Sequence, residues 1–439
     1  MQTTFTLQQL ADPQLKESEK ILRACVHCGF CNATCPTYQL LGDELDGPRG
    51  RIYLIKDMLE HDRPATEDMA THLDRCLSCL ACMTTCPSGV HYMHLVDHAR
   101  VHVEKTYKRS FVDRTVRGLL AKVLPYPTRF RAALFLATFA RPLVPLFKAM
   151  GLKPLAAMLA LAPRNVQGRD TVLLVYQAEG ARQGRVALMI GCANEVLGSS
   201  ITQSTIRVLT RHGIEVVVPP EAGCCGSLVH HMGRETEALA FARTNIDAWT
   251  REIEGEGLDA ILITISGCGT TVKDYGFMLR ADQAYAAKAK RVSMLARDVS
   301  EYFAKLRLKP SGQAAPLTVA YHSACSLQHG QRVVREPKEV LSRVGFVVKD
   351  VPEGHLCCGS AGTYNMLQPD IADRLRARKV ENIEKVAPDV IAAGNIGCIM
   401  QIGAGTTIPI VHPAELVDWA TGGIIPRVLE QSLAGKQAG

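Results

Sequence analysis

Eight cysteines in the first 90 residues repeat one spacing twice, and this pattern constrains the fold of the 439-residue chain more than any other feature. The first run holds Cys25, Cys28, Cys31 and Cys35, and the second holds Cys76, Cys79, Cys82 and Cys86. A proline follows the last cysteine of each run. Thiols spaced three residues apart in a turning loop can converge on one centre, so we expect metal-binding loops here. Residues 1–20 contain no apolar leader, which predicts a cytosolic chain whose clustered thiols stay reduced.

The spacing of both runs is that of ferredoxins with two [4Fe–4S] clusters, in which three cysteines of a run bind one cluster and the fourth binds the other. We therefore assign one cluster to Cys25, Cys28, Cys31 and Cys86, and the second to Cys35, Cys76, Cys79 and Cys82. The alternative is structural zinc, but Cys₄ zinc sites typically use paired Cys-x-x-Cys spacings without a third cysteine and a closing proline. Two neighbouring clusters indicate a chain that conducts single electrons.

The remaining eight cysteines form an internal repeat. The first set is Cys192, Cys224, Cys225 and Cys268, and the second is Cys325, Cys357, Cys358 and Cys398. Within each set the first two steps are 32 and 1 residues, and both adjacent pairs continue as Gly-Ser. The repeat predicts two similar units that lie side by side. Four thiols in each unit are enough for an additional iron–sulfur cluster, and redox-active or partner-facing thiols are the alternatives.

Secondary-structure signals favour parallel sheets in the two repeat units. Short β-branched runs precede each cysteine group, and helix-like stretches such as residues 199–213 and 369–386 separate them. Alternating strands and helices predict βα units with the cysteines at the carboxyl ends of the strands. The predicted fold class is α+β and multidomain, with a helical two-cluster ferredoxin-like domain before two α/β units. The predicted boundaries are 1–110 for the first domain, 111–182 for a helical connector, and 183–308 and 315–432 for the two units.

The chain's net charge of +7 arises in the connector. From Arg114 to Arg169 there are ten Lys or Arg residues and no Asp or Glu. Its longest charge-free run, residues 154–163, is short of the roughly 18–20 residues that cross a bilayer, so we predict no spanning helix. Peripheral contact with an anionic membrane or an acidic partner is one interpretation, and a solvated connector is the other. Nucleic-acid binding is not favoured, because no recognition motif accompanies the charge.

Two smaller signals lie near the cysteines. Arg49 and Arg51 follow the first run, and either raise the reduction potential of a cluster or belong to a solvated turn. His322, His329 and His355 flank the cysteines of the second unit and are interpreted as hydrogen-bonded loop histidines rather than ligands. The chain contains no flavin fingerprint, and we assign it no catalytic residue.

Several stretches carry a resemblance to a known family. They are ILRACVHCGFCNATCPTYQLLGDELDGPRGRIYLIKDMLE, HLDRCLSCLACMTTCPSGV, EAGCCG and HLCCGSAGTY. Over nearly its whole length the chain resembles the iron–sulfur subunits of bacterial glycolate oxidases. The repeat units also resemble the cysteine-rich domains of heterodisulfide reductases, which end in Cys-x-x-Cys. Here Thr271 and Gln401 occupy the position of that fifth cysteine, so an additional cluster would lack one ligand.

The resemblance implies an electron-transfer subunit of an enzyme complex. Separate FAD-containing glycolate oxidase subunits would oxidise glycolate to glyoxylate, and this chain would pass the electrons towards a respiratory acceptor. The implied location is cytoplasmic, peripheral on the cytoplasmic face of the inner membrane. D-lactate, L-lactate and glycerol 3-phosphate remain alternative substrates. A heterodisulfide-reductase-like catalytic subunit and a structural zinc adaptor remain alternative functions.

Overall fold

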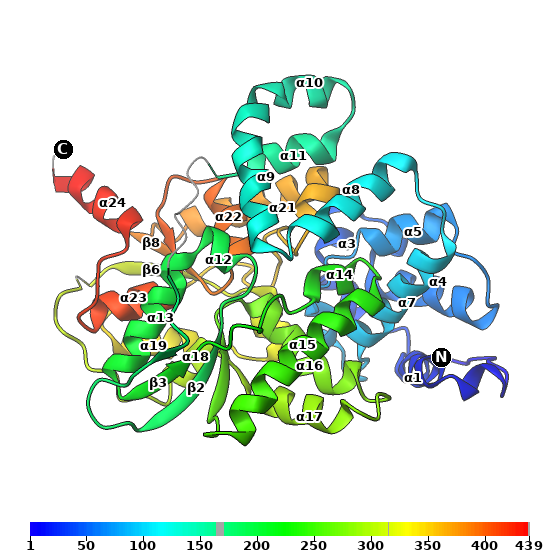
Figure 1. Ribbon diagram of the computed structural model, residues 1–439. Coiled ribbons are helices and arrows are strands. Elements are labelled where there is room, and N and C mark those ends of the chain that lie inside the picture. Colours follow the sequence, from blue (N-terminus) through cyan, green and yellow to red (C-terminus); the bar gives the residue numbers. More distant parts are fainter. Residues whose placement is uncertain (164–170, 315, 438–439) are drawn as a thin grey trace.

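The computed structural model describes residues 1–163, 171–314 and 316–437, and it confirms the predicted fold class (Figure 1). A helical amino-terminal domain and a helical connector precede two units that each contain a mainly parallel sheet. The predicted domain boundaries stay predictions. Residue 315, with which the second unit was predicted to begin, lies outside the described residues, as do the basic residues Arg164 and Arg169 of the connector.

Short helices joined by the cysteine loops form the amino-terminal domain. The helices are α1 (Pro13–Ala24), α2 (Phe30–Ala33), α3 (Pro36–Leu41), α4 (Pro48–Glu60), α5 (Glu67–Asp74), α6 (Ala81–Thr85) and α7 (Tyr92–Thr106), with 3₁₀ turns η1 (Gln9–Ala11) and η2 (Glu44–Asp46). Pro36 and Pro48 are the first residues of helices, a position at which the backbone N–H that proline lacks would have no partner within the helix. Leu22, Ile55 and Leu95 are fully buried where α1, α4 and α7 meet, so the core lies behind the cysteine loops.

The connector projects from the body of the molecule as a bent set of helices, at the top of Figure 1. Its helices are α8 (Phe111–Val123), α9 (Pro127–Ala140), η3 (Arg141–Leu143), α10 (Val144–Ala149) and α11 (Lys153–Leu161). The apolar side chains of Phe135, Leu136 and Phe139 are exposed on α9. Residues 111–161 are therefore helical as predicted, with an apolar surface that faces outward, whereas Val175–Tyr176, also within the predicted connector of residues 111–182, forms a strand that pairs with the sheet of the first unit.

The apolar run of this connector is longer than expected from the sequence. The run Pro127–Ala149 is long and apolar enough to cross a membrane by length and composition, and little of it is buried. The prediction relied on the longest charge-free run and so overlooked a window that tolerates two charges. A 3₁₀ turn at Arg141–Leu143, which includes Pro142, separates α9 from α10 within this run.

The first repeat unit contains five strands in the order β1-β3-β2-β4-β5. The strands are β1 (Val175–Tyr176), β2 (Gly184–Met189), β3 (Ile214–Val217), β4 (Ala260–Ile263) and β5 (Ala296–Asp298). Its helices are α12 (Asn194–Leu197), α13 (Ser199–Arg211), α14 (Ser227–His231), α15 (Glu235–Glu254), α16 (Ser266–Met278), α17 (Ala286–Leu295) and α18 (Val299–Phe303). Only β1 runs antiparallel to its neighbour.

The second unit contains four parallel strands in the order β7-β6-β8-β9. The strands are β6 (Thr318–His322), β7 (Val347–Asp350), β8 (Val390–Ala393) and β9 (Ile410–Val411). Its helices are the π-helical turn η4 (Ser326–Gln331) and α19 (Glu336–Arg343), α20 (Tyr364–Leu367), α21 (Pro369–Glu384), α22 (Ile396–Gly403), α23 (Pro413–Ala420) and α24 (Arg427–Gln437).

The two sheets confirm the internal repeat. Strands β3-β2-β4-β5 of the first unit match β7-β6-β8-β9 of the second in order and direction. The central registers match as well, because Met189 pairs with Ile263 at the end of β2 as His322 pairs with Ala393 at the end of β6. The strand runs predicted before each cysteine group are all present, whereas the short strands β1, β5 and β9 were not predicted.

The two units share one hydrophobic core. Val186 and Leu209 of the first unit belong to the same buried cluster as Val319 and Trp419 of the second. Helix α13 packs against α23, and α18 packs against α19, so each unit places two helices against helices of the other. The buried Asp418 on α23 is fixed by ion pairs from α13 of the first unit. The repeat therefore folds as a single body, with a cysteine group in each half.

Candidate functional site

The first predicted ligand set surrounds one hollow of the amino-terminal domain. Cys25, Cys28, Cys31 and Cys86 line a space of about 440 Å³, to which Pro48 and Tyr92 also contribute. Cys25 is buried, Cys31 and Cys86 are half-buried, and Cys28 is exposed. The structure therefore brings together three cysteines of the first run and the last cysteine of the second, and one edge of the hollow reaches the surface.

The second predicted set surrounds an adjacent hollow. Cys35, Cys76, Cys79 and Cys82 line a space of about 320 Å³, and all four are buried. Pro48, Cys82 and Tyr92 line both hollows, so one thin wall separates them. The donor set fits [4Fe–4S] clusters, which cysteine thiolates hold. Each set takes its fourth cysteine from the other run, and this exchange places the two centres next to each other.

Both cysteine loops use the same unusual backbone conformation. In the first, His27 and Gly29 have φ values of 57° and 84°, and in the second Ser78 and Leu80 have φ values of 49° and 62°. These residues stand two and four positions after the first cysteine of each run. Left-handed conformations turn the chain back on itself, which allows three consecutive thiols to face one hollow. A Cβ atom at Gly29 would lie 2.6 Å from the guanidinium of Arg49, so a side chain there would displace that arginine.

Arg51 forms a buried polar network behind the second hollow. Only 1 % of it is exposed, and it donates hydrogen bonds to the carbonyl oxygen of His72 at 2.7 Å and the hydroxyl of Thr37 at 3.1 Å. Its guanidinium also lies 3.5 Å from the carboxylate of Asp46 and 3.9 Å from the sulfur of Cys35. The solvated-turn interpretation is therefore wrong for Arg51. A fixed positive charge beside a cluster stabilises its reduced form, which favours the alternative.

Burial also governs the protonation of the arginines and thiols. Burial disfavours the charge on Arg51, yet neighbouring acidic groups, including Cys76, Cys35 and Asp46, keep its pKa above the ordinary value. Burial raises the pKa of Cys79 and Cys82 well above that of a free thiol. Metal binding to these thiols therefore releases protons. Arg49 is less buried and bonds to Glu44 at 2.6 Å, so its charge is locally balanced.

The repeat units also gather their predicted cysteines. In the first unit the sulfur of Cys192 lies 3.7 Å from that of Cys224, and the free thiols of Cys225 and Cys268 form a hydrogen bond. In the second unit the corresponding contacts are Cys325 to Cys357 at 3.7 Å and Cys358 to Cys398. Each set therefore closes into a chain of thiol contacts at the carboxyl ends of the strands, as predicted.

Glycines after the adjacent cysteines make this closure possible. Gly226 and Gly359 have φ values of 83° and 91°, and their amide nitrogens donate to the sulfurs of Cys224 and Cys357 at 3.4 Å. A Cβ atom at Gly359 would lie 2.6 Å from the carbonyl oxygen of Ala372. The close approach of α21 therefore requires glycine at this turn.

Neither unit has a cysteine at the fifth position of the motif. The side chain of Gln401 is buried, donates to the carbonyl oxygen of Ala372 at 3.1 Å and accepts from Asn365 at 3.1 Å. The hydroxyl of Thr271 donates to the carbonyl oxygen of Gly267. Both side chains are thus occupied by hydrogen bonds within the protein.

His322 does not match its predicted role. It is the last residue of β6 rather than part of a loop, and neither ring nitrogen has a hydrogen-bond partner in the described structure. His329 is hydrogen-bonded as interpreted, to the hydroxyl of Thr84 at 2.7 Å and the carbonyl oxygen of His355 at 3.1 Å, but it lies in the helical turn η4 rather than in a loop. The sequence signal that would have distinguished His322 is its register in β6, which places it beside the cysteines.

The second unit's cysteine group lies beside the amino-terminal domain. Leu77 and Cys79 of that domain belong to one apolar cluster with Cys357 and Tyr364, and Cys325 packs against it. The hydroxyl of Tyr364 donates to the carbonyl oxygen of Arg75 at 3.0 Å. The second hollow, whose four cysteines are all buried, therefore lies between the cysteine loops and the second repeat unit.

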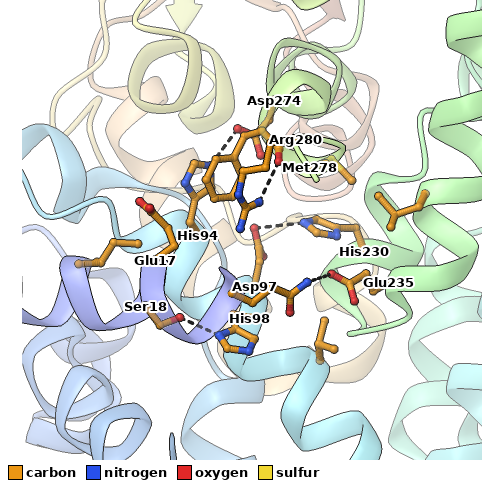
Figure 2. Close-up of a pocket in the computed structure, with 15 residues that line it drawn as sticks. Glu17, Ser18, His94, Asp97, His98, His230, Glu235, Asp274, Met278 and Arg280 are labelled. Atoms are coloured by element: carbon orange, nitrogen blue, oxygen red, sulfur yellow. Dashed lines mark hydrogen bonds and ion pairs between the residues drawn. The ribbon is translucent and has the colours of Figure 1, made fainter. Parts of the chain in front are cut away.

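A separate hollow of about 540 Å³ lies where the amino-terminal domain meets the first unit (Figure 2). His94 on α7 bonds to Asp274 on α16 at 2.9 Å, and Asp97 lies 3.3 Å from His230 on α14. No cysteine lines this hollow. Its charged groups pair across the boundary, so it holds the two parts together rather than forming a third sulfur site.

Comparisons with known proteins agree with this architecture. Residues 21–90 match the family described as 4Fe-4S dicluster domain, and residues 186–273 and 319–403 each match the family described as Cysteine-rich domain. A glycolate oxidase iron-sulfur subunit of Escherichia coli is 44 % identical over 96 % of this chain and 99 % of its own length. The chain belongs to the family of glycolate oxidase iron–sulfur subunits. As in this family, the amino-terminal domain carries two [4Fe–4S] clusters and the chain serves as an electron-transfer subunit.

More distant relatives of this glycolate oxidase iron–sulfur family member support the same fold. A probable glycolate oxidase iron-sulfur subunit of Bacillus subtilis is 28 % identical over 91 % of the chain and 94 % of its own length. Lactate utilization protein A of Geobacillus thermodenitrificans is 25 % identical over 53 % of the chain and 98 % of its own length. A solved structure of a hypothetical protein from Helicobacter pylori has a TM-score of 0.55 with 10 % identity, covers 95 % of this chain and 74 % of its own, and shares the fold.

Proposed function

We propose that this chain transfers electrons from FAD-containing partner subunits that oxidise glycolate to glyoxylate. The observation that carries the proposal is the pair of four-cysteine hollows that share a wall of Pro48, Cys82 and Tyr92. Removing hydrogen from a 2-hydroxy acid is two-electron chemistry suited to a flavin. The clusters supply one-electron steps, and this chain's residues hold them close together.

The crossed ligand assignment is part of this proposal. The first cluster is held by Cys25, Cys28, Cys31 and Cys86, and the second by Cys35, Cys76, Cys79 and Cys82. Each set lines its own hollow, which supports the assignment. The hydroxyl of Tyr92 donates to the sulfur of Cys76 at 3.9 Å, and the guanidinium of Arg51 donates to the sulfur of Cys35 at 3.9 Å. These donors favour reduction of the second cluster, because hydrogen bonds to ligand sulfurs stabilise added negative charge.

Electrons enter at the first cluster. Its ligand Cys28 is exposed, and the apolar side chains of Val26, Phe30 and Tyr53 are exposed around it. Exposed apolar groups beside a redox centre favour a partner subunit that covers them. The second cluster has no such access, because its four cysteines are buried and the second repeat unit lies against it. The flavin-bearing subunit therefore docks over residues 26–30 and 53.

Reduction by substrate tests the proposal directly. The purified complex, kept free of oxygen, should show reduced-cluster signals in low-temperature electron paramagnetic resonance after glycolate is added. Phe30→Glu should slow this reduction strongly while the isolated subunit still accepts electrons from dithionite. Leu7→Glu, at another exposed apolar residue, is the matched control and should leave the reduction unchanged. Clusters that dithionite reduces but glycolate never does would contradict the proposal.

Lactate is the second candidate substrate. The similarity to lactate utilization protein A over half of the chain favours it over other 2-hydroxy acids. The same experiment with D-lactate, L-lactate and sn-glycerol 3-phosphate separates these rivals from glycolate. Faster cluster reduction by one of them would transfer the proposed role to that substrate.

A peripheral site on the cytoplasmic face of the inner membrane completes the proposal. The connector exposes Phe135, Leu136 and Phe139, it also carries exposed basic residues such as Arg129 and Lys148, and its residues 114–163 contain no acidic residue. Apolar insertion combined with positive charge is the pattern that binds anionic bilayers. We expect the chain to sediment with anionic vesicles and not with neutral ones, and Phe135→Ser with Phe139→Ser to abolish sedimentation. Equal binding to neutral vesicles, or none to anionic ones, would contradict this location.

A further inference from the structure

The hollow where the amino-terminal domain meets the first unit has the size and lining of a small-molecule site. We call it the junction hollow. Its volume of about 540 Å³ is larger than that of either cluster hollow and lies within the range of about 300–1,000 Å³ typical of ligand pockets. Apolar side chains form much of its wall, namely Ile21, Val101, Leu239, Phe277 and Met278. Apolar walls with a few convergent polar groups are the usual composition of a site for a small organic molecule.

Two imidazole–carboxylate pairs face the junction hollow (Figure 2). His94 on α7 bonds to Asp274 on α16 at 2.9 Å, and His230 on α14 lies 3.3 Å from Asp97 on α7. In each pair one partner comes from the amino-terminal domain and the other from the first unit, so the pairs exist only where the two parts meet. An imidazole held by a carboxylate can give a proton to a bound molecule and take another from water.

The ring of His94 is fixed before any ligand binds. It stacks on the ring of Phe277 with centroids 3.4 Å apart, and on that of His91 with centroids 3.8 Å apart. The guanidinium of Arg280 lies 3.7 Å from the centre of the Phe277 ring and so fixes that ring in turn. A donor held in this way needs no reorganisation when charge develops on a bound molecule.

The second pair retains an unused nitrogen. Nδ1 of His230 is buried and has no hydrogen-bond partner among the described residues, while Nε2 faces Asp97. Buried polar atoms are nearly always bonded, so a bound molecule or water is expected at this nitrogen. Although burial opposes the charge on this imidazole, the neighbouring Asp97 keeps its pKa above the ordinary value. His230 therefore carries a proton that it can donate.

Helix α7 connects the junction hollow with the clusters. Its first residue, Tyr92, lines both cluster hollows, whereas His94 and Asp97 on the same helix line the junction hollow. Ile21 of α1 also lines the junction hollow and belongs to the same buried core as several cluster ligands. Packed side chains of one domain thus join the clusters to the junction hollow.

The charges around the junction hollow favour a neutral ligand. The carboxylates that line it are those of Glu17, Asp97, Glu235 and Asp274, and its cations are Arg280 and the protonated His230. This excess of negative charge repels a carboxylate such as glycolate. Met278 also packs with Ala121 of the connector helix α8. The junction hollow therefore adjoins the segment that we propose to lie on the bilayer, where neutral apolar carriers dissolve.

We propose that the junction hollow binds the headgroup of a quinone, and that the electrons leave the chain there. A p-quinone is neutral, has a flat apolar ring, and becomes a hydroquinone by taking up two electrons and two protons at its two oxygens. The two reduced clusters give one electron each. His94 and His230 give one proton each, which forms an O–H bond, and take their replacements from water at the rim. The inference rests on the proposed electron-transfer role and names the acceptor class, but it does not depend on which substrate is oxidised.

Oxidation of the reduced chain by a quinone tests the proposal without partner subunits or glycolate. The full-length chain, reduced with dithionite in the absence of oxygen and freed of it by desalting, is mixed with duroquinone in a stopped-flow spectrometer. We expect duroquinone to bind the oxidised chain in equilibrium dialysis and to restore the absorbance of the oxidised clusters after mixing. Ferricyanide, which takes single electrons and no protons, is the control acceptor. A chain that does not bind duroquinone, or whose clusters are oxidised by ferricyanide alone, would overturn the proposal.

Filling the hollow separates specific binding from unspecific oxidation. Leu239→Trp places a larger side chain in the junction hollow and should weaken duroquinone binding by about tenfold or more, while ferricyanide still oxidises the clusters at the unchanged rate. Ala240→Trp, at the next and exposed residue of α15, is the matched control and should bind duroquinone like the unchanged chain. Equal binding by the two variants would place the quinone elsewhere and overturn the site.

Asp274→Asn tests the proton donation and guards against misfolding of the tryptophan variant. The amide keeps the size of the side chain but removes the charge that holds a proton on His94. At saturating duroquinone, cluster oxidation should slow by about a hundredfold, within the range that general acid catalysis contributes, with little change in the dissociation constant. Asp282→Asn, in an ion pair with Arg243 outside the hollow, is the control. Equal slowing with ferricyanide would show that Asp274 is merely structural and overturn the proton donation. Clusters that glycolate leaves oxidised would contradict the proposed substrate alone, since these measurements use dithionite.

Discussion

The amino-terminal domain and the repeat units contain eight cysteines each, yet they arrange them differently. In the amino-terminal domain the thiols stand around two hollows, and in the repeat units they contact one another at the ends of strands. Left-handed loop residues produce the first arrangement, and sheet edges closed by a glycine turn produce the second. Identical ligand atoms therefore prepare different metal chemistry, because the backbone sets the distance between them.

The two regions also place charge differently. Arg51 donates towards the buried cluster ligands, whereas Lys379 lies beside the thiols of the second unit only. The first repeat unit instead surrounds its cysteines with Asn245 and Tyr275, which bond to the backbone oxygens of Cys224 and Cys225. Hydrogen bonds from the thiols of Cys192 and Cys225 hold the pKa of Cys224 well below that of a free thiol, whereas the same contacts raise the pKa of Cys192 and Cys225.

The largest effect should come from a cysteine that lines both hollows. Cys82→Ser should reduce the iron content from about eight to about four per chain, and electron transfer from substrate to acceptor should fall to background. Cys225→Ser, at a buried cysteine of the first unit, is the matched change and should keep all eight irons. Iron and sulfide quantitation with an acceptor-reduction assay measures both. Equal iron loss in the two variants would remove the distinction between the two regions.

The grouping of cysteines was predictable from the sequence, because ligand spacing is a local property. The strands before each cysteine group were predictable for the same reason, since each is a short β-branched run. The two-residue strands β1 and β9 were not, because so short a run carries no periodicity. The burial of Arg51 was also missed, since its partners His72 and Thr37 come from other segments of the chain.

His322 shows a further limit of sequence reasoning. No motif contains it, and its approach to Cys358 and Cys398 depends on the register of three parallel strands. The docking of the second unit against Cys79 was equally hidden, because these residues are more than 240 positions apart. Local patterns thus predicted the ligands of the clusters but not the surroundings that tune them.

The next effect sharpens the contrast in charge. Arg51→Met should lower the free energy of unfolding by about 1–3 kcal/mol, because the carbonyl oxygen of His72 and the hydroxyl of Thr37 lose a buried donor, while Asp46 keeps its ion pair with Arg75. It should also make the potential of the second cluster more negative, since a positive charge is lost beside Cys35. Arg49→Met removes a more exposed ion pair and should change stability by less than about 1 kcal/mol. Redox titration and urea unfolding measure the pair, and an unchanged potential in the first variant would contradict the role of Arg51.

A smaller effect should appear at the turn that closes the thiols of the second unit. Gly359→Ala should destabilise the protein by about 2 kcal/mol or more, because its φ is left-handed and its Cβ would meet the carbonyl of Ala372. Gly42→Ala has a similar φ of 70° but open space around it, so about 1 kcal/mol is expected there. Urea midpoints compare the two. Equal midpoints would show that backbone conformation alone, rather than the closeness of α21, decides the cost.

The smallest effect concerns the ion pair that joins the two regions. Burial lowers the pKa of His230, but the nearby Asp97 raises it by more, so the net shift is upward. Although burial raises the pKa of Asp97, His230 and His231 lower it below the ordinary value. The contribution of His230 is therefore complete below its unfolded pKa of about 6.5 and is lost as the pH rises through its higher folded value. The contribution of Asp97 is complete above about pH 4 and is lost as the pH falls further. The pair should thus stabilise the docked form most between about pH 4 and 6.5.

Substitution of His230 separates this pair from the rest of the interface. His230→Gln should lower stability by about 2 kcal/mol near pH 6, the worth of a charge-assisted hydrogen bond, and by much less at pH 9. Hydrogen exchange of α14 at the two pH values measures the loss where it occurs. His94→Gln, which breaks the bond to Asp274 at the same boundary, is the comparison. If hydrogen exchange of α14 in the His230 variant were altered equally at both pH values, packing rather than charge would hold the two domains together. The two cysteine-rich regions would then differ in the arrangement of their thiols and not in how charge stabilises them.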